Sequence, residues 1–192
     1  QAEVRQWAPD PAAYSIEQLD KKLAEFLVDR DTLWHAIGHD ATWDARIAKA
    51  LNEVRAQTRA GKRAPRAIHD LRAELDTMRL VKDAHELDLM RHAAQISSGA
   101  HRRAMERTRP GWFEYQVEAE LLHEFLRHGA QAVAYPSIVA SGPNACVLHY
   151  RDNDREMAAG DLLLVDAGCE YRGYASDITR TFPVDGRFSG PQ

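Results

Sequence analysis

The most constraining feature of the sequence is a pair of apolar segments, each carrying one aspartate, with a short turn-forming stretch between them. The first, 162–166, reads Leu-Leu-Leu-Val-Asp and ends in Asp166, and the second, 176–182, carries Asp177 near its start. Apolar runs of this length around a Gly- and Tyr-rich turn predict two β-strands paired as an antiparallel hairpin. A turn centred directly after Tyr171 places Asp166 opposite Asp177.

In that register the two aspartates lie on one face of the sheet, with Cβ atoms about 4.5–5.5 Å apart. Like charges in this position destabilise a sheet, and burial beside leucine, valine and isoleucine increases the cost. A pair of divalent cations would offset the repulsion, because carboxylates bridge metals about 3.5–4 Å apart in two-metal hydrolases. The alternative is that Asp166 and Asp177 each cap a turn beside a glycine, without a metal. The spacing alone leaves both interpretations open.

A second candidate site residue is His149, which follows the turn-forming sequence Gly-Pro-Asn at 142–144. We expect the apolar segment 147–149 to be a short strand. A histidine there can hydrogen-bond a reacting group or transfer a proton near neutral pH. The alternative is a core histidine that is bonded to a backbone carbonyl. The sequence contains no Walker A loop, no Gly-x-Gly-x-x-Gly, no Gly-x-Ser-x-Gly and no His-Glu-x-x-His, so those chemistries have no support.

The chain before residue 129 is predicted to be helical. Apolar residues recur at helical spacing, and the expected helices are 15–27, 42–60, 66–78, 83–107 and 113–128. Asp83 and Glu86 fit a capping box that opens the fourth helix. After Gly129 the pattern changes to short strands, expected at 137–140, 147–149, 161–166 and 177–184. A domain boundary is expected between residues 80 and 83.

The composition excludes several classes of protein. With a net charge of -4 the chain has no basic surplus, so nucleic-acid binding is not supported. No apolar run approaches the roughly 20 residues that span a bilayer, and residues 1–10 do not form a signal peptide. The only two cysteines, Cys146 and Cys169, are expected to be buried thiols in a reducing cytoplasm, with a disulfide between them as the alternative. A homo-oligomer is compatible with this composition.

Several of these segments together resemble aminopeptidase P, the Xaa-Pro aminopeptidases of the pita-bread metallopeptidases. The resemblance is carried by residues 78–82, 138–144, 148–150, 165–171 and 176–184. It implies an α/β (α+β) fold in two parts. Residues 1–80 would be a helical remnant, the C-terminal part of the family's N-terminal domain. Residues 81–192 would be the first half of the catalytic domain, with helices over a curved, mainly antiparallel sheet.

The resemblance also implies roles for three residues. Asp166 and Asp177 would be the first two of five metal ligands for two divalent ions, usually Mn, with Co or Zn as alternatives. His149 would contact the substrate rather than a metal. The other ligands, one His and two Glu, come from later strands of the family's fold, and no segment here matches them. We therefore expect an internal fragment that is inactive alone and needs the remaining half of the catalytic domain.

The implied activity is removal of the N-terminal residue that precedes proline, from peptide substrates, in the cytoplasm. One alternative is prolidase, which shares the Leu-His-Tyr and Ser-Asp-Ile-Thr sequences and cleaves only dipeptides. Another is a pita-bread module that has lost catalysis and only binds proteins. Such modules usually lose metal ligands, so the presence of Asp166 and Asp177 argues against this alternative.

Overall fold

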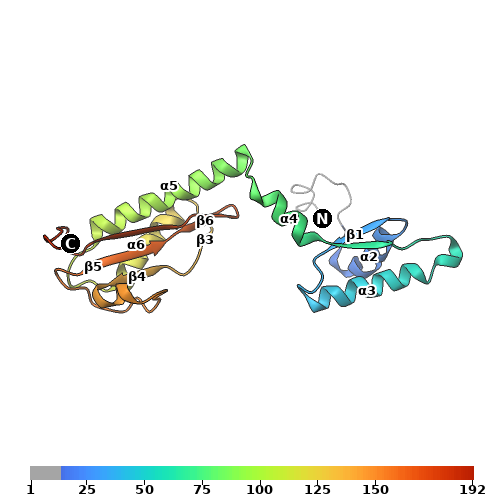
Figure 1. Cartoon of the computed structure of the whole chain (residues 1–192), viewed down its shortest axis with the longest axis horizontal. Coiled ribbons are helices and arrows are strands. Elements are labelled where there is room, and N and C mark those ends of the chain that lie inside the picture. Colours follow the sequence, from blue (N-terminus) through green and yellow to red (C-terminus); the bar gives the residue numbers. More distant parts are fainter. Residues whose placement is uncertain (1–13) are drawn as a thin grey trace. The chain divides into compact units, whose positions relative to one another are not determined.

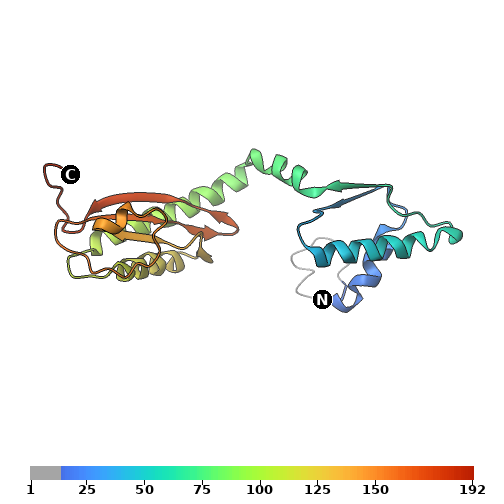
Figure 2. The ribbon, with the colours of Figure 1, turned by 60° about the horizontal axis from the view of Figure 1, so that its bottom comes forward.

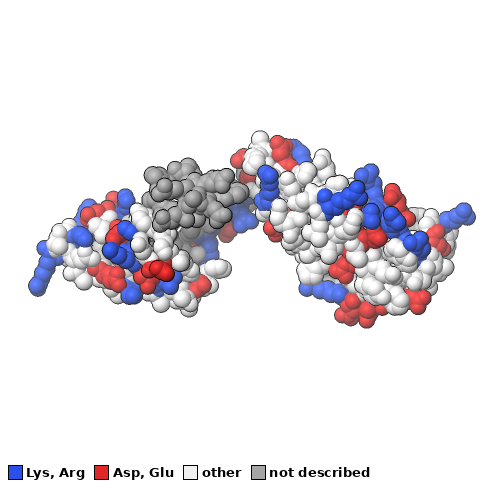
Figure 3. Space-filling model, turned by 180° about the vertical axis from the view of Figure 1, so that it is seen from behind, with Lys and Arg blue, Asp and Glu red and all other residues white. Residues whose placement is uncertain are grey.

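The computed structural model describes residues 14–192, so the first 13 residues of the predicted N-terminal part lie outside the described residues. The chain separates into two compact units, Gln1–Val81 and Lys82–Gln192 (Figure 1). No helix within residues 14–192 is both long and apolar enough to cross a membrane. Basic and acidic side chains are both spread over the face of each unit seen in Figure 3, as expected at a net charge of -4.

The N-terminal unit contains helices and a two-stranded parallel sheet. Its elements are η1 (Ile16–Gln18), α2 (Leu19–Leu27), β1 (Thr32–His35), α3 (Ala41–Arg55), η2 (Thr58–Ala60), β2 (Ala67–Asp70) and α4 (Leu71–Leu80). Helix α3 begins after Asp40, whose side chain accepts hydrogen bonds from the backbone N–H groups of Thr42 and Trp43. The small core consists of Ala24 and Leu27 from α2 with four residues of α3, namely Ile47, Ala50, Leu51 and Val54.

Two sequence predictions for this unit are wrong. The part is not purely helical, because β1 and β2 pair in parallel with Thr32 opposite Ala67. The helix expected at 66–78 begins only at Leu71, since Ile68 lies in β2. Each strand has four residues, and its partner lies 35 positions away in the sequence, so local periodicity carries little information about this pairing.

The C-terminal unit has two helices on one side of two antiparallel sheets. Its elements are α5 (Ala84–Arg107), α6 (Glu114–Arg127), β3 (Ala132–Val133), β4 (Ile138–Ser141), η3 (Gly142–Cys146), β5 (Leu162–Ala167), β6 (Cys169–Tyr171), β7 (Tyr174–Ala175) and β8 (Ile178–Pro183). The sheets have the strand orders β4-β5-β8 and β3-β6-β7. In Figure 2 the green helix α5 passes behind the strands, and α6 lies beneath them. The predicted capping box at Asp83 and Glu86 is present, and the predicted α/β fold with antiparallel sheets is confirmed.

Strand β5 determines which side chains face the helices. Leu163, Val165 and Ala167 are buried in the core that α5 and α6 cover. Leu164 and Asp166 alternate with them and are only partly buried. Because successive side chains of a strand point to opposite faces, Asp166 lies on the face that α5 and α6 do not cover.

The predicted register of the aspartate strands is wrong. Asp166 lies opposite Thr179, because the turn is centred between Arg172 and Gly173, one residue later than expected. Both turn residues have left-handed backbones, with φ 50 and φ 84, as in a two-residue hairpin turn. When the turn centre moves by one residue, the cross-strand partner of each residue changes by two positions. Because side chains alternate between faces, a change of two leaves every side chain on the same face of the sheet. Asp177 therefore precedes β8 instead of facing Asp166.

Candidate active site

The two predicted metal ligands converge on a single tyrosine. The Tyr135 hydroxyl lies 2.6 Å from Oδ1 of Asp166 and 2.9 Å from Oδ1 of Asp177. The two carboxylate oxygens are therefore no further apart than the sum of these two distances. Asp166 is partly buried and Asp177 is exposed. The structure thus brings the pair together across one phenol, although they are not cross-strand partners.

One phenol does not neutralise two ionised carboxylates. A phenol has one proton to donate, whereas each carboxylate is only an acceptor. Burial, together with hydrogen bonds to the two carboxylates, raises the pKa of Tyr135 well above its usual value, so the hydroxyl keeps its proton at neutral pH. The donor atoms are all oxygens, which hard divalent cations prefer. The residues present therefore fit the binding of a divalent cation.

The ligand set is incomplete within the described part of the chain. No group of three or more His, Cys, Asp or Glu side chains between residues 14 and 192 is arranged to hold a metal ion. Sequence reasoning also missed Tyr135. It lies 31 and 42 positions from the aspartates that it contacts, and no local pattern marks a tyrosine between a short loop and β4 as part of a site.

Asp177 is positioned by close packing of the backbone around Gly168. A Cβ atom at Gly168 would lie 1.7 Å from the carbonyl oxygen of Ser176, so only glycine fits there. The buried Ser176 hydroxyl contacts the Cys169 backbone N–H at 3.1 Å and the Ser97 hydroxyl of α5 at 2.7 Å. These contacts fix the backbone immediately before Asp177 against β6 and α5.

A buried histidine supports the strand below Asp166. His101 of α5 is 3% exposed, and its Nε2 atom lies 3.1 Å from the carbonyl oxygen of Ala167. Burial lowers the pKa of His101, so the ring is neutral at pH 7. Because a carbonyl oxygen only accepts, the Nε2–H group is the donor. Its hydrogen bond links α5 to the residue that follows Asp166.

His149 lies in a loop, so the prediction of a strand at 147–149 is wrong. Residues 142–146 form the 3-10 helix η3, and Leu148 beyond it is 86% exposed. Residues 147–149 are apolar in part but exposed, and they pair with no strand of residues 14–192. His149 itself has a left-handed backbone with φ 54, a conformation that costs a non-glycine residue roughly 1–2 kcal/mol.

The loop nevertheless brings His149 to the same hollow as Asp166. This hollow has a volume of about 300 Å³ and is lined by Ile138, Ala140, Ala145, Cys146, Val147, Leu148, His149, Leu164, Asp166 and Thr179. Its lining is mainly apolar, and its titratable side chains are His149, Asp166 and Cys146. Cys146 is exposed, so the prediction of two buried thiols is wrong at this position, and both cysteines are free.

Two carboxylates that share one tyrosine are compatible with a divalent cation, and comparison with known proteins identifies the family. Residues 88–192, more than half of the chain, match Metallopeptidase family M24. The chain therefore belongs to this family, whose members are metallopeptidases and use divalent metal ions.

The similar proteins are aminopeptidases. The chain is 46% identical over 180 residues to the Xaa-Pro aminopeptidase of Escherichia coli, covering 94% of this chain and 41% of that protein. The structure of Pseudomonas aeruginosa aminopeptidase PepP is 48% identical with a TM-score of 0.88, over 93% of this chain and 40% of that one. Zn-substituted E. coli aminopeptidase P in complex with product is 46% identical with a TM-score of 0.88, over 94% of this chain and 41% of that one. The chain thus spans about two fifths of the length of these relatives.

Proposed function

We propose that this chain contributes Asp166, Asp177 and His149 to the active site of an Xaa-Pro aminopeptidase with two divalent metal ions. The observation that carries the proposal is the convergence of the two carboxylates on Tyr135, in a chain of a metallopeptidase family. The names of the similar proteins support the choice of aminopeptidase over prolidase.

The chemistry follows from the residues. When bound, two divalent cations would lower the pKa of a water molecule and polarise the scissile carbonyl. Asp166 and Asp177 would hold the cations, and the Tyr135 hydroxyl would orient both carboxylates. His149, at the hollow that Asp166 also lines, would bind and orient the peptide. We propose Mn as the metal, with Co and Zn as alternatives. The full ligand set would combine carboxylate oxygens with one imidazole that lies beyond residues 1–192.

The extent of the similar proteins supports a proposal about the domains. Residues 1–80 would be the C-terminal part of an N-terminal domain, and 81–192 the first half of the catalytic domain. The remaining ligands would follow after residue 192, in what we call the full-length protein. Both cysteines are free thiols, in keeping with the proposal of a reducing, cytoplasmic location.

Peptide cleavage by the full-length protein with Mn tests this function. We expect release of the first residue from an Xaa-Pro-Xaa tripeptide, and no turnover by residues 1–192 alone. Asp166→Asn and Asp177→Asn should abolish cleavage, whereas Asp185→Asn, an exposed aspartate just after β8, should not. Cleavage of Xaa-Pro dipeptides alone would indicate prolidase, and no cleavage at all would indicate a binding module. Substantial turnover by residues 1–192 would refute the proposal that the second half is needed.

A further inference from the structure

One side chain of the C-terminal unit accepts many hydrogen bonds, although it is neither Asp166 nor Asp177 and does not line the hollow. Glu114, the first residue of α6, is 0% exposed. Its carboxylate accepts hydrogen bonds from the Ser141 backbone N–H and hydroxyl and from the Tyr150 hydroxyl, each at 2.7 Å. It also accepts from the Arg155 backbone N–H at 3.1 Å and from the Asn144 amide at 3.2 Å. A buried carboxylate is tolerated only when it is satisfied in this way.

Glu114 remains ionised despite its burial. Burial raises the pKa of the carboxyl, but the hydrogen bonds from Tyr150, Ser141 and Arg155 outweigh it, so the pKa is below the usual value. The Arg155 guanidinium supplies a nearby positive charge, since it donates to the Ser141 hydroxyl at 2.8 Å. A carboxylate with this many donors is a rigid anchor, because moving any one donor leaves buried polar atoms unpaired.

The donors flank the loop that carries His149. Ser141 ends β4, and Asn144 lies in η3, ahead of the loop. Tyr150 directly follows His149, and Arg155 lies at the far end of the loop. One carboxylate on α6 therefore fastens the backbone on both sides of His149, which itself is exposed and has a left-handed conformation.

The same helix fastens the loop a second time. Glu118, one turn after Glu114, accepts from the Asn153 amide at 2.9 Å. The Asn153 side chain also bonds to β4 and the residue before it, accepting from the Val139 N–H and donating to the Ser137 carbonyl, each at 3.0 Å. Side chains of α6 and the backbone around β4 therefore hold the loop, and they do so through residues other than His149.

We propose that Glu114 is a positioning residue, which holds the loop so that His149 stays at the hollow that Asp166 also lines. The inference rests on the proposed role of His149 in substrate binding. Glu114 acts through Tyr150, Asn144 and the backbone, and has no contact of its own with the substrate.

A double-mutant cycle in the full-length Mn protein tests this proposal. Glu114→Gln leaves a single acceptor oxygen and turns an NH2 group towards donors, so the loop shifts. Since a misplacement of 1 Å can cost about 100-fold, we expect kcat/KM on an Xaa-Pro tripeptide to fall by at least about tenfold. In a His149→Ala background the same change should have less than about a twofold further effect, because the residue being positioned is gone. Metal content should stay at the wild-type value.

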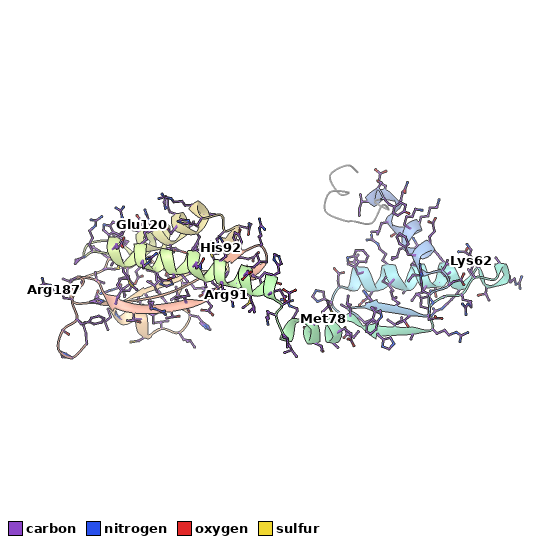
Figure 4. All side chains as sticks on the ribbon, turned by 90° about the horizontal axis from the view of Figure 1, so that it is seen from above. Lys62, Met78, Arg91, His92, Glu120 and Arg187 are labelled. Atoms are coloured by element: carbon purple, nitrogen blue, oxygen red, sulfur yellow. The ribbon has the colours of Figure 1, made fainter. Side chains whose placement is uncertain are left out.

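The matched control is Glu120→Gln, the same chemical change on the same helix. Glu120 pairs with Arg103 of α5 at 2.6 Å, on the α5–α6 side of the unit (Figure 4), and kcat/KM should stay within about twofold of wild type. If Glu114→Gln does not fold, Tyr150→Phe removes one hydroxyl and must show the same loss and the same non-additivity. Unchanged kcat/KM in Glu114→Gln or Tyr150→Phe, full additivity with His149→Ala, or loss of metal would overturn the proposal.

The His149 ring signal in side-chain NMR separates this proposal from the proposed function. We expect this signal to broaden or split in Glu114→Gln and to remain a single sharp line in Glu120→Gln. If the wild-type protein cleaves no Xaa-Pro peptide but the signal responds in this way, positioning by Glu114 stands and the proposed function fails. If the signal is unchanged in Glu114→Gln, the positioning role is refuted whatever the activity.

Discussion

Replacing Gly168 by alanine should severely damage the candidate metal site. The new Cβ atom would lie 1.7 Å from the Ser176 carbonyl oxygen, 2.6 Å from its carbonyl carbon and 3.2 Å from the Asp177 nitrogen. All three are backbone atoms, so no side-chain rotation relieves the clash. Strand β5, which carries Asp166, and the segment that carries Asp177 must move apart by more than about 1 Å to restore ordinary contacts.

The expected loss of stability follows from these distances. Overpacking in a close-packed region costs about 1–3 kcal/mol. Separating the segments also weakens the hydrogen bond from the Ser176 N–H to the Cys169 carbonyl, at 2.9 Å, which contributes about 1 kcal/mol. The lower entropy of the unfolded alanine variant offsets up to about 1 kcal/mol. Because the clash is with backbone atoms, the upper end of the overpacking range applies, and we expect the free energy of unfolding of the C-terminal unit to fall by about 3 kcal/mol.

Urea unfolding, with hydrogen exchange of the α5 amides as the reporter, measures this change in residues 1–192. Gly173→Ala is the matched control, because Gly173 has φ 84 but no atom within 4 Å of the position that a Cβ atom would take, so it should lose only about 1–2 kcal/mol. In the full-length protein Gly168→Ala should also weaken Mn binding, while Gly173→Ala should not. A loss below about 1 kcal/mol at Gly168, with unchanged Mn affinity, would refute the reasoning.

Three further outcomes are expected. Gly99→Ala within α5 should stabilise the chain by about 0.5–1 kcal/mol, because its Cβ would meet only Glu124 at 3.8 Å; a lower Tm would contradict this. Since burial lowers the pKa of His101 in the folded state, the unfolded chain binds more protons in mild acid. Stability should therefore be lost as the pH falls below about 6.5, and urea titrations of His101→Gln should show a flatter dependence. Tyr135→Phe should destabilise the metal-free protein by about 1–2 kcal/mol and the Mn-bound protein by less, and equal losses with and without Mn would count against a cation between the carboxylates.

The helices and the aspartate strand of the C-terminal unit could be predicted because their signals are local. The stripe of Val117, Leu121 and Phe125 is completely buried, as its helical spacing indicates. The alternation in β5 similarly follows from strand geometry. The pairing of β1 with β2 could not be predicted, since neither short strand has a distinctive pattern of its own.

At the site, residue types were easier to predict than geometry. The closeness of Asp166 and Asp177 survives the error in register, because a two-residue shift keeps side chains on their face of the sheet. Tyr135 and Glu114 were missed, since each acts through contacts with residues far away in the sequence. The loop around His149 depends on side-chain bonds to α6, which periodicity does not encode.

The metal content of the full-length protein, measured by elemental analysis after dialysis against Mn, tests the central claim most directly. We expect two bound ions per chain, with losses in Asp166→Asn and in Asp177→Asn but not in Asp185→Asn. A wild-type protein without stoichiometric metal, or aspartate variants that retain both ions, would contradict the assignment of these two carboxylates as metal ligands.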